Sequence, residues 1–240
     1  FMREWTALME SGSGERGIFN RQASVRQAAK NGRRESNYEF GTNPCSEIIL
    51  RPNQFCNLTE VVIRANDNIE DLTRKVRIAT ILGTIQSTYT HFPYLRNMWK
   101  YNTKEERLLG VSLTGIMDNP LMTTKNKGLK ETLEYLKNVA INTNAEWSDR
   151  LGIPVSTAIT CCKPSGTVSQ LVNSSSGIHA RHSPYYIRTV RGDNKDPLTQ
   201  FMISQNIPSE PDVMKPDSTT VFSFPMKSPK GAITRTQMNA

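Results

Sequence analysis

The chain has 240 residues, of which 37% are hydrophobic and 22% charged, a balance that suits a packed core and excludes wholesale disorder. Its formal net charge of +8 favours an anionic partner, either nucleic acid or a phosphorylated small molecule. The sequence shows no secretory signal and no stretch long enough to span a membrane, and its four cysteines are too few for a disulfide scaffold. We therefore expect a reducing, cytoplasmic setting and no membrane partner.

Helices and one buried strand are predicted in the first half of the chain. Residues 2–10 are predicted to be helical, and residues 57–64, which are rich in β-branched side chains, to form a buried strand. A long helix follows a cap at Asp67 or Asn68, because apolar residues recur there with a period close to 3.6. Residues 78–85 are apolar on nearly all sides, so we expect them to be well buried.

Helices and strands alternate in the second half. Residues 103–106 (TKEE) have the form of a capping box and predict a helix that opens there and continues over residues 108–116. Another helix is predicted over residues 129–147. Strands are predicted over 155–162, 185–190 and 219–224, and a helix over 196–206. This alternation predicts an α/β architecture with parallel strand pairing, with no repeat and no domain linker.

The cysteines do not have the spacing of a metal site. Cys45 and Cys56 are eleven residues apart, and Cys161 and Cys162 are adjacent. Structural zinc sites use close pairs such as C-x2-C. His91, His179 and His182 have no ligand spacing with a carboxylate or a cysteine either, so the sequence predicts no metal.

Residues 43–47 (NPCSE) combine three chemically useful groups. In an extended backbone, Asn43, Cys45 and Glu47 would lie on one side, since side chains alternate with period two. The amide can hold a hydroxyl, the carboxylate can remove a proton, and the thiol can act as a nucleophile or a hydrogen-atom carrier. Pro44 stiffens the loop by restricting the residue before it to extended geometry. An inert loop cysteine is the alternative.

The motif NPCSEI (43–48) resembles the active-site finger loop of ribonucleotide reductases. Other stretches resemble successive blocks of that family, in family order: GIFNRQA (17–23), QFCNLTEVV (54–62), EERLLGVSLTGIMD (105–118), KPSGTVSQL (163–171) and SGIHARHSPYYIR (176–188). The proline after the motif asparagine and the short gap between the cysteines resemble the adenosylcobalamin-dependent class. FNRQA and HSPYYIRTVR resemble its monomeric, triphosphate-reducing branch.

This resemblance implies the fold and the organisation of the chain. Residues 1–240 would form part of a ten-stranded α/β barrel with a central finger loop at about 41–56 and a phosphate loop at about 163–169. The family's N-terminal allosteric region and C-terminal tail would lie outside the chain. The tyrosines at 185 and 186 are expected to pack in a strand rather than to carry radicals.

The resemblance also implies roles for the finger-loop residues. Cys45 would be the thiyl radical that takes the 3′ hydrogen of the ribose, Glu47 would accept the 3′-hydroxyl proton, and Asn43 would bind ribose hydroxyls. Cys56 would be one of two thiols that reduce the 2′ position and end as a disulfide. In the family the second thiol lies upstream, and no cysteine precedes Cys45, so we expect the chain to be incomplete. The cysteines at 161 and 162 are expected to be ordinary strand thiols.

A second block resembles the substrate-phosphate loop of the family. A glycine-containing turn before a helix exposes backbone N–H groups, and hydroxyls add further donors. The alternative is a plain strand-to-helix turn, and Lys163 either adds charge or faces solvent. The residues assigned to phosphate binding are Pro164, Ser165, Gly166, Thr167 and Ser169.

The implied activity is the reduction of ribonucleotides to 2′-deoxyribonucleotides, the precursors for DNA replication, by a thiyl-radical mechanism. Adenosylcobalamin would be the cofactor, a ribonucleoside di- or triphosphate the substrate, and a dithiol such as thioredoxin the reductant. The remainder of the reductase chain would be a partner, without which we expect no turnover. Nucleic acid is disfavoured because the basic residues are scattered. Two alternatives stay open: part of the large subunit of an iron-dependent reductase, or a non-catalytic nucleotide-binding remnant.

Overall fold

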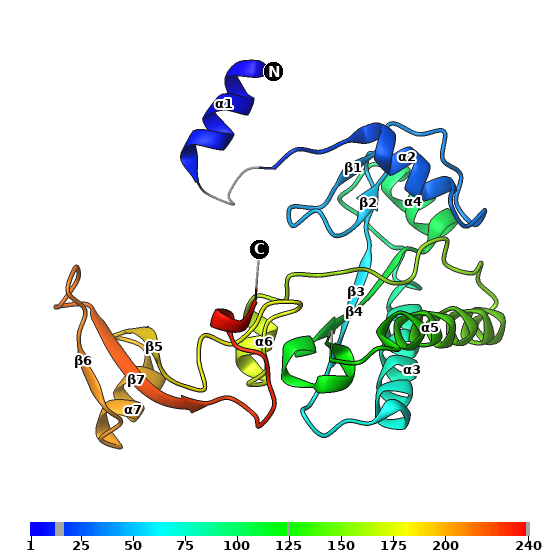
Figure 1. The fold of residues 1–240 in the computed structure, drawn as a ribbon. Helices are drawn as coiled ribbons and strands as arrows, with labels where there is room; N and C mark the ends of the chain where they lie inside the picture. The colour runs from blue at the N-terminus through cyan, green and yellow to red at the C-terminus, as the bar shows by residue number, and fades with distance from the viewer. Residues whose placement is uncertain (13–16, 124, 239–240) are drawn as a thin grey trace. The chain divides into compact units, whose positions relative to one another are not determined.

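The computed structural model describes residues 1–12, 17–123 and 125–238. The chain divides into two compact units, each assembled from separate segments (Figure 1). The first unit comprises Phe1–Val61, Glu70–Leu113 and Glu131–Pro164, and the second comprises Val62–Ile69, Thr114–Lys130 and Ser165–Ala240. Over the described ranges, no helix combines the length and the apolar character needed to cross a bilayer.

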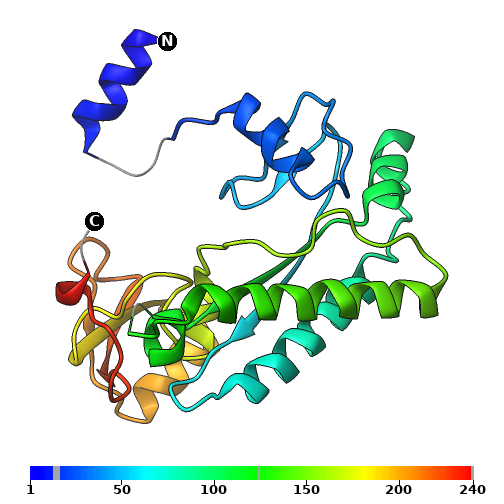
Figure 2. The ribbon, with the colours of Figure 1, turned by 45° about the vertical axis from the view of Figure 1, so that its right-hand side comes forward.

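Five helices belong wholly or mainly to the first unit. The longest two, α3 and α5, lie side by side (Figure 2) and are joined by an ion pair between Arg77 and Glu146, with 2.8 Å between nitrogen and oxygen. Asn144 of α5 also donates to the hydroxyl of Thr84 on α3, at 3.0 Å. The predicted long helices are confirmed. The bounds are α1 (Met2–Ser11), α2 (Arg21–Ala29), α3 (Ile69–Gln86), α4 (Asn97–Glu106) and α5 (Leu129–Leu151).

Only one side of α3 is buried. Leu72 and Val76 are fully covered, whereas Ile78, Leu82 and Ile85 are 47%, 57% and 40% exposed. The expectation that residues 78–85 are well buried is therefore wrong. An apolar sequence raises the gain from burial, but burial itself depends on which other segments cover each side of the helix.

The predicted helix at 103–116 is also wrong. Helix α4 ends at Glu106, and Arg107 adopts a left-handed conformation with a φ of 48°. The strand β4 (Leu109–Thr114) follows at once. The residues TKEE therefore close a helix instead of opening one. Leu109 to Ser112 are all buried, and a strand covered on both faces lacks the alternation that distinguishes a strand from a helix.

The predicted strand over 57–64 is confirmed as β3 (Asn57–Val62), which pairs with β4. The N–H of Asn57 donates to the carbonyl of Leu108, and that of Ile63 donates to the carbonyl of Thr114. In both bonds the acceptor lies 51 positions after the donor (108 − 57 and 114 − 63). The two strands therefore run in the same direction and form a parallel pair, as predicted. Residues 158–161 line the other edge of β4, but they form only an isolated parallel bridge, between Val111 and Thr160. The strand predicted over 155–162 is thus reduced to one bridge.

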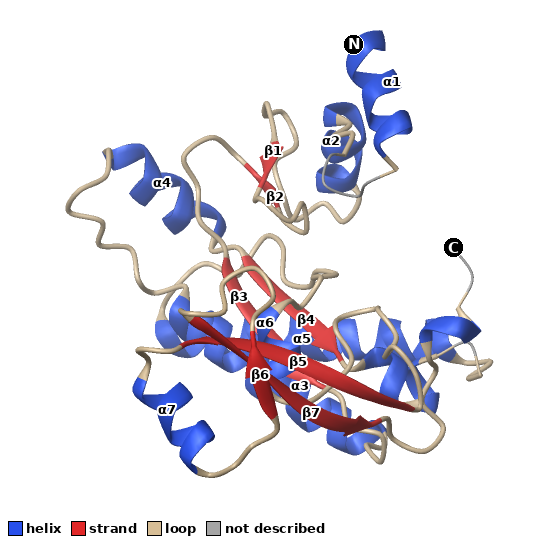
Figure 3. Cartoon of the chain, turned by 90° about the vertical axis from the view of Figure 1, so that its left-hand side faces the viewer, coloured by secondary structure: helices blue, strands red, loops and turns tan. Residues whose placement is uncertain are grey.

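Two short strands, β1 (Gly41–Thr42) and β2 (Ile49–Leu50), form an antiparallel hairpin. In the second unit, β5 (Tyr185–Asp193), β7 (Thr219–Lys227) and β6 (Ser209–Pro211) form a sheet in the order β5-β7-β6 (Figure 3). The strands predicted over 185–190 and 219–224 are confirmed. Their pairing is antiparallel, so the expected parallel pairing does not extend to this sheet.

The remaining elements of the second unit are short helices. Helix α7 (Pro197–Ser204) confirms the helix predicted over 196–206, and the side chain of Asp196 caps it by accepting from the N–H of Leu198. The others are α6 (Thr167–Leu171) and the 3-10 helices η1 (Ile116–Asp118), η2 (Pro120–Met122) and η3 (Arg235–Gln237). The described residues thus form a mixed α/β structure, as predicted.

Candidate active site

The finger-loop motif forms the tip of the β1–β2 hairpin. The N–H of Ser46 donates to the carbonyl of Asn43 at 3.0 Å, which closes a four-residue turn with proline at its second position, where proline is favoured. The N–H of Ile48 donates to the side-chain oxygen of Asn43 at 3.0 Å, and Ser46 has a φ of 62°. The tip is therefore a tight turn. The prediction that Asn43, Cys45 and Glu47 alternate along an extended backbone is wrong.

The turn leaves the predicted catalytic groups in different surroundings. Cys45 is exposed at the tip. Glu47 is half-buried, and its Oε2 atom is buried without a hydrogen-bond partner in the described part of the chain. The side-chain oxygen of Asn43 is used inside the hairpin, which leaves its NH2 group as the donor to offer a ligand.

Helix α3 packs against one face of the β3–β4 pair, so the side chains of the two strands can be assigned to the face that α3 covers or to the opposite face. A Cβ atom added at Gly83 of α3 would lie 3.5 Å from Thr59 and 3.5 Å from Leu109, so these odd-numbered residues face α3. Side chains alternate along a strand, and the even-numbered residues point to the opposite face. These are Leu58, Glu60, Gly110 and Ser112.

Gly110 is the point where three segments meet on that opposite face. A Cβ atom there would overlap Leu58 of β3, would lie 2.9 Å from Ile48 of the hairpin and would lie 3.2 Å from the sulfur of Cys161. The missing side chain lets the finger hairpin and the segment at 161 approach the same spot. We call this surface the thiol face; it comprises Cys56, Leu58, Glu60, Gly110, Ser112 and Cys161.

The thiols on this face are held in their protonated form. Burial, and next the charge of Glu47, raise the pKa of Cys56, while Lys163 acts in the opposite sense. The same two causes raise the pKa of Cys161 to about 12. Of the predicted residues, Glu47 and Cys56 are thus near enough for the charge of Glu47 to act on the Cys56 thiol. The structure adds Cys161 and Lys163, which sequence reasoning treated as an ordinary strand thiol and an unassigned charge.

Cys56 and Cys161 lie on opposite edges of β4. Cys56 directly precedes β3, whereas the N–H of Cys161 donates to the carbonyl of Val111 across the other edge. Neighbouring strands lie about 4.8 Å apart, so the two Cα atoms are separated by roughly 10 Å or more, beyond the ~6.8 Å limit of a disulfide. This geometry agrees with the expectation that Cys161 is not the partner of Cys56.

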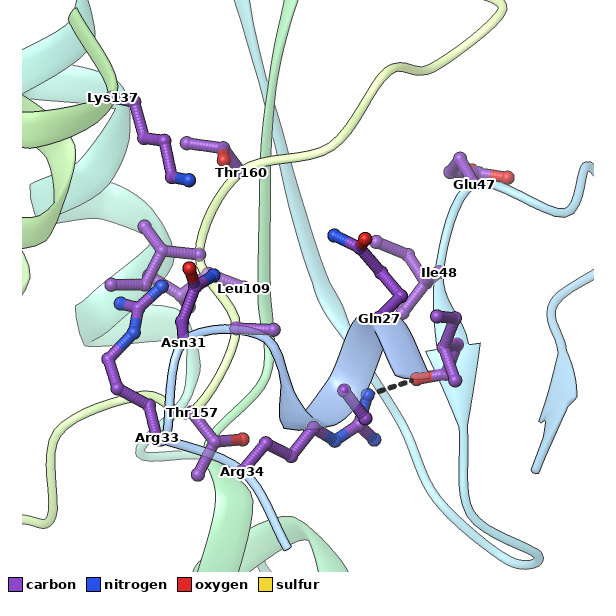
Figure 4. A pocket seen from close by; sticks show the side chains of 14 residues that line it. Gln27, Asn31, Arg33, Arg34, Glu47, Ile48, Leu109, Lys137, Thr157 and Thr160 are labelled. Carbon is purple, nitrogen blue, oxygen red and sulfur yellow. Dashed lines mark hydrogen bonds between the residues drawn. The ribbon is translucent and has the colours of Figure 1, made fainter. Parts of the chain in front are cut away.

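A pocket of about 190 Å³ adjoins Glu47. Figure 4 shows Lys137 beside Thr160 on one side of this pocket and Glu47 on the other. Arg33 also lines the pocket, and its Nη1 atom is buried with no hydrogen-bond partner among residues 1–12, 17–123 and 125–238. The cations give this part of the first unit a positive lining next to the hairpin.

A buried ionic network fixes the base of the finger hairpin. Arg34 donates from Nε and Nη2 to the two carboxylate oxygens of Glu106, both at 2.8 Å, and from Nη1 to the carbonyl of Ile49 in β2 at 2.9 Å. Arg51 pairs with the same carboxylate at 3.2 Å. The side chains of Arg34, Arg51 and Glu106 are 5%, 2% and 1% exposed. Sequence reasoning missed this network, because no local pattern links residues 34, 51 and 106.

The predicted phosphate loop leads into α6. Its exposed members are Pro164, Gly166 and Thr167, whereas Ser165 and Ser169 are buried. The Ser169 hydroxyl donates to the carbonyls of Ser165 and Gly166, at 2.9 and 2.8 Å, so it shapes the loop. From Ser165 onward the loop belongs to the second unit, whereas the finger hairpin belongs to the first.

Other candidates in the second unit have local partners. His179 contacts the carbonyl of Ser176, and Arg181 contacts the hydroxyl of Tyr186. Tyr185 is 70% exposed, so the packing expected of the tyrosine pair fits Tyr186 alone. In the portion of the chain that the structure describes, no cluster of three or more His, Cys, Asp or Glu side chains could hold a metal ion.

Comparison with known proteins shows which family the chain resembles. No family model matches the chain. It is 30% identical, over 90% of its length, to the adenosylcobalamin-dependent ribonucleoside-triphosphate reductase of Levilactobacillus brevis. It is 30% identical over 78% of its length to the Lactobacillus delbrueckii subsp. bulgaricus enzyme of that name, and 29% identical over 87% to the Euglena gracilis one. The chain spans 32%, 28% and 28% of these relatives, about a third of their length.

The structural comparison agrees with the sequence matches. A crystal structure of a B12-dependent (class II) ribonucleotide reductase superposes with a TM-score of 0.68 at 24% identity, covering 81% of this chain and 30% of that one. The fold is thus that of part of a ribonucleotide reductase. Sequence and structure thus both show that the chain is similar to adenosylcobalamin-dependent ribonucleotide reductases. This confirms the resemblance noted in the sequence and favours it over the iron-dependent alternative.

Proposed function

We propose that the chain is part of the catalytic α/β barrel of an adenosylcobalamin-dependent enzyme that reduces ribonucleoside triphosphates to 2′-deoxyribonucleotides. The names of the relatives support the cofactor and the triphosphate substrate. The observation that carries the proposal is the finger hairpin, which exposes Cys45 and brings Ile48, the neighbour of Glu47, against Gly110 on the thiol face. The complete barrel would have ten strands, with residues 41–56 as its central finger loop.

Cys45 fits the role of hydrogen-atom carrier. Its thiol is exposed at the tip of a tight turn, so both a radical source and a ribose could approach it. Adenosylcobalamin, when bound, would supply the organic radical that removes the hydrogen atom of this thiol. The protein's contribution is placement: the buried network at the hairpin base holds the tip for transfer of the 3′ hydrogen to sulfur.

Glu47 and Asn43 fit the handling of the ribose hydroxyls. The Oε2 atom of Glu47, which lacks a hydrogen-bond partner within the described ranges, can accept the proton of the 3′-hydroxyl. The NH2 group of Asn43 can donate to a ribose oxygen, because its carbonyl is already anchored by Ile48. Deprotonating the 3′-hydroxyl of a C3′ radical eases loss of the neighbouring 2′-hydroxyl.

Cys56 fits the role of proton donor to the departing 2′-hydroxyl. Its raised pKa keeps the thiol protonated near neutral pH, as a general acid requires. In the balanced reaction the 2′-hydroxyl leaves as water, a hydrogen replaces it at C2′, and two thiols are oxidised to one disulfide. The second thiol would come from elsewhere in the complete reductase. A dithiol such as thioredoxin would reduce the disulfide, in keeping with a cytoplasmic setting.

Residues 163–169 fit the binding of the substrate phosphates. Gly166 and Thr167 are exposed at the start of α6, where backbone N–H groups have no partner within the helix. Thr167 adds a hydroxyl donor, and Pro164 and Ser165 would set the path of the loop. Ser169 would hold the loop in shape through its two bonds to carbonyl oxygens.

The test uses the complete reductase that contains this chain, supplied with adenosylcobalamin, a ribonucleoside triphosphate and a dithiol. Cys45→Ser should abolish formation of deoxyribonucleotide, because an alcohol O–H bond is too strong to replace the thiol. Cys162→Ser, the same change at an exposed cysteine, should retain most of the activity. Turnover by Cys45→Ser, or turnover by the parent enzyme without adenosylcobalamin, would contradict the proposal. No turnover by the parent enzyme would favour a non-catalytic remnant.

A further inference from the structure

The pocket of about 190 Å³ beside the finger hairpin is built by residues of the first unit alone. Its lining comes from α2 and the turn after it, from the hairpin, β4 and α5, and from residues 157–160. Residues 163–169, which form the predicted phosphate loop, do not line it. The pocket is therefore a different site from the one proposed for the substrate phosphates.

The charges around this pocket are unequal. Of the charged side chains that line it, Arg33, Arg34 and Lys137 are positive and Glu47 is negative. Arg34 is already neutralised by Glu106, through two bonds of 2.8 Å. No ion pair joins Arg33 or Lys137 to a carboxylate among the residues that the structure describes. Two cations thus remain in the lining, against the one carboxylate of Glu47.

The polar side chains divide between two ends of the pocket (Figure 4). Lys137 and Thr160 lie at one end, and Glu47 lies at the other. Asn31 and Arg33 are on the side of Lys137, and we call these four residues the cationic end. The Nη1 atom of Arg33 is buried without a hydrogen-bond partner in the described ranges. Because an unpaired buried donor is costly, this end lacks an acceptor.

We propose that the cationic end binds a phosphate group, either free or carried by a small molecule. The guanidinium of Arg33 presents its N–H groups in a fork that matches phosphate oxygens, and the ammonium of Lys137 adds a second charge. The amide of Asn31 and the hydroxyl of Thr160 can donate to the remaining oxygens. This site lies outside the proposed function and does not rest on it.

The size of the pocket agrees with a ligand group of this kind. Pockets that enclose a whole drug-sized molecule measure about 300–1,000 Å³, whereas this one measures about 190 Å³. An oxyanion therefore fits better than a complete nucleoside. Glu47 would repel an anion, but it lies at the far end of the pocket from Lys137 (Figure 4).

A bound phosphate would also act on the finger hairpin. Ile48 and Ile49 of the hairpin line the same pocket. Arg34, the next residue after Arg33, donates to the carbonyl of Ile49 at 2.9 Å. A ligand held by Arg33 and Lys137 would thus connect the turn after α2 to α5 beside the base of the hairpin. Since such a ligand binds the folded chain, phosphate should raise the midpoint of urea unfolding.

The test is calorimetric titration of the full chain with inorganic phosphate at constant ionic strength. We expect saturable binding at a single site. Arg33→Gln and Lys137→Gln should each raise the Kd about tenfold or more, because each removes a charged partner of the anion. The matched controls are Arg26→Gln on α2 and Lys130→Gln on α5, at exposed positions outside the pocket. They should leave the Kd within about twofold, since salt screens distant charges.

A parallel titration with β-glycerophosphate identifies the form of the ligand. Binding of both probes would support a phosphate group carried by a small molecule, and binding of inorganic phosphate alone would support the free anion. No binding of either probe, or equal weakening in the pocket variants and their controls, would overturn the inference. Lys137 is exposed on a long helix, so its variant carries the test if Arg33→Gln is unfolded by circular dichroism.

One further variant separates this site from the predicted phosphate loop. Thr167→Ala removes a hydroxyl from that loop and should leave the binding of inorganic phosphate unchanged. Binding that is lost in Thr167→Ala but kept in Arg33→Gln and Lys137→Gln would place the anion on the loop and overturn the inference. These titrations need no turnover, so an inactive enzyme that binds phosphate through Arg33 and Lys137 would refute the proposed function alone.

Discussion

Two buried arginine–carboxylate clusters lie near the two ends of β4 and are built differently. Before the strand, Glu106 is shared by Arg34 and Arg51. After it, Asp118 pairs with Arg181 alone, through two bonds of 2.8 and 2.9 Å. The first cluster concentrates two positive charges on one buried carboxylate, and the second is balanced one to one.

The two clusters also hold different segments. Arg34 and Arg51 carry the finger hairpin, and each also lies over an aromatic ring, of Phe40 and Tyr38, at 4.8 and 3.7 Å from the ring centroids. Arg181 holds the segment after α6, donating to the backbone and side-chain oxygens of Asn173. Asp118 accepts from the N–H of Ser175. Both clusters anchor the base of a loop, but only the first depends on a single carboxylate for two cations.

The largest expected effect follows from removing that carboxylate. Glu106→Gln leaves two buried guanidinium groups without their shared charge, and breaking a buried pair in this way costs about 3–5 kcal/mol. Urea unfolding of the full chain should show this loss. The control is Glu105→Gln: Glu105 pairs with Arg51 but is 60% exposed, so its loss should cost less than ~1 kcal/mol. Equal losses in the two variants would show that Glu106 does not anchor the cluster.

A smaller effect is expected in the second cluster. Asp118→Asn removes the charge that faces Arg181, which keeps its bonds to Asn173, so we expect about 2–3 kcal/mol. Burial lowers the pKa of Arg181, whereas the bonds and charge of Asp118 raise it above its usual value, so the variant loses the group that compensates for the burial of this guanidinium. Urea unfolding measures the difference. A loss larger than that of Glu106→Gln would reverse the ranking of the clusters.

The smallest expected effect is a change of stability with pH. It comes from a buried thiol and not from the ionic clusters. The folded-state pKa of Cys161 is raised from 9.0 to about 12. The protonated thiol therefore contributes stability fully below pH 9, and this is lost as the pH rises from 9 towards 12, at up to about 1.4 kcal/mol per pH unit. Cys161→Ala should flatten the fall in unfolding free energy between pH 9 and 10, whereas Cys162→Ala should not. Equal slopes in both variants would show that the fall has another origin.

Much of the local structure could be predicted from the sequence, because it depends on neighbouring residues. The period of α3, the cap of α7 and the β-branched run of β3 are all local signals. The helix predicted over residues 103–116 was wrong because no local signal was available there. Strand β4 is buried on both faces, and a run of buried residues shows no period in the sequence. The exposure of Leu82 could not be read either, because it depends on which segments cover α3.

The candidate site divides in the same way. The finger motif singled out Asn43, Cys45 and Glu47 as candidates, and an Asn-Pro pair could have indicated the turn that the structure shows. Glu60 of the thiol face pairs with Lys163 at 3.8 Å, and this contact joins residues about a hundred positions apart, so it depends on the strand order around β4. No spacing in the sequence encodes that order.

Gly110 couples the packing of the thiol face to the position of the radical-carrying thiol proposed at Cys45. Ile48 sits against this glycine, and the hydrogen bond from Ile48 to Asn43 ties it to the turn that carries Cys45. The position of the hairpin tip therefore depends on the absence of a side chain at residue 110. A methyl group there would push Ile48 away and shift the turn, and this would displace the sulfur of Cys45 in a different segment of the chain.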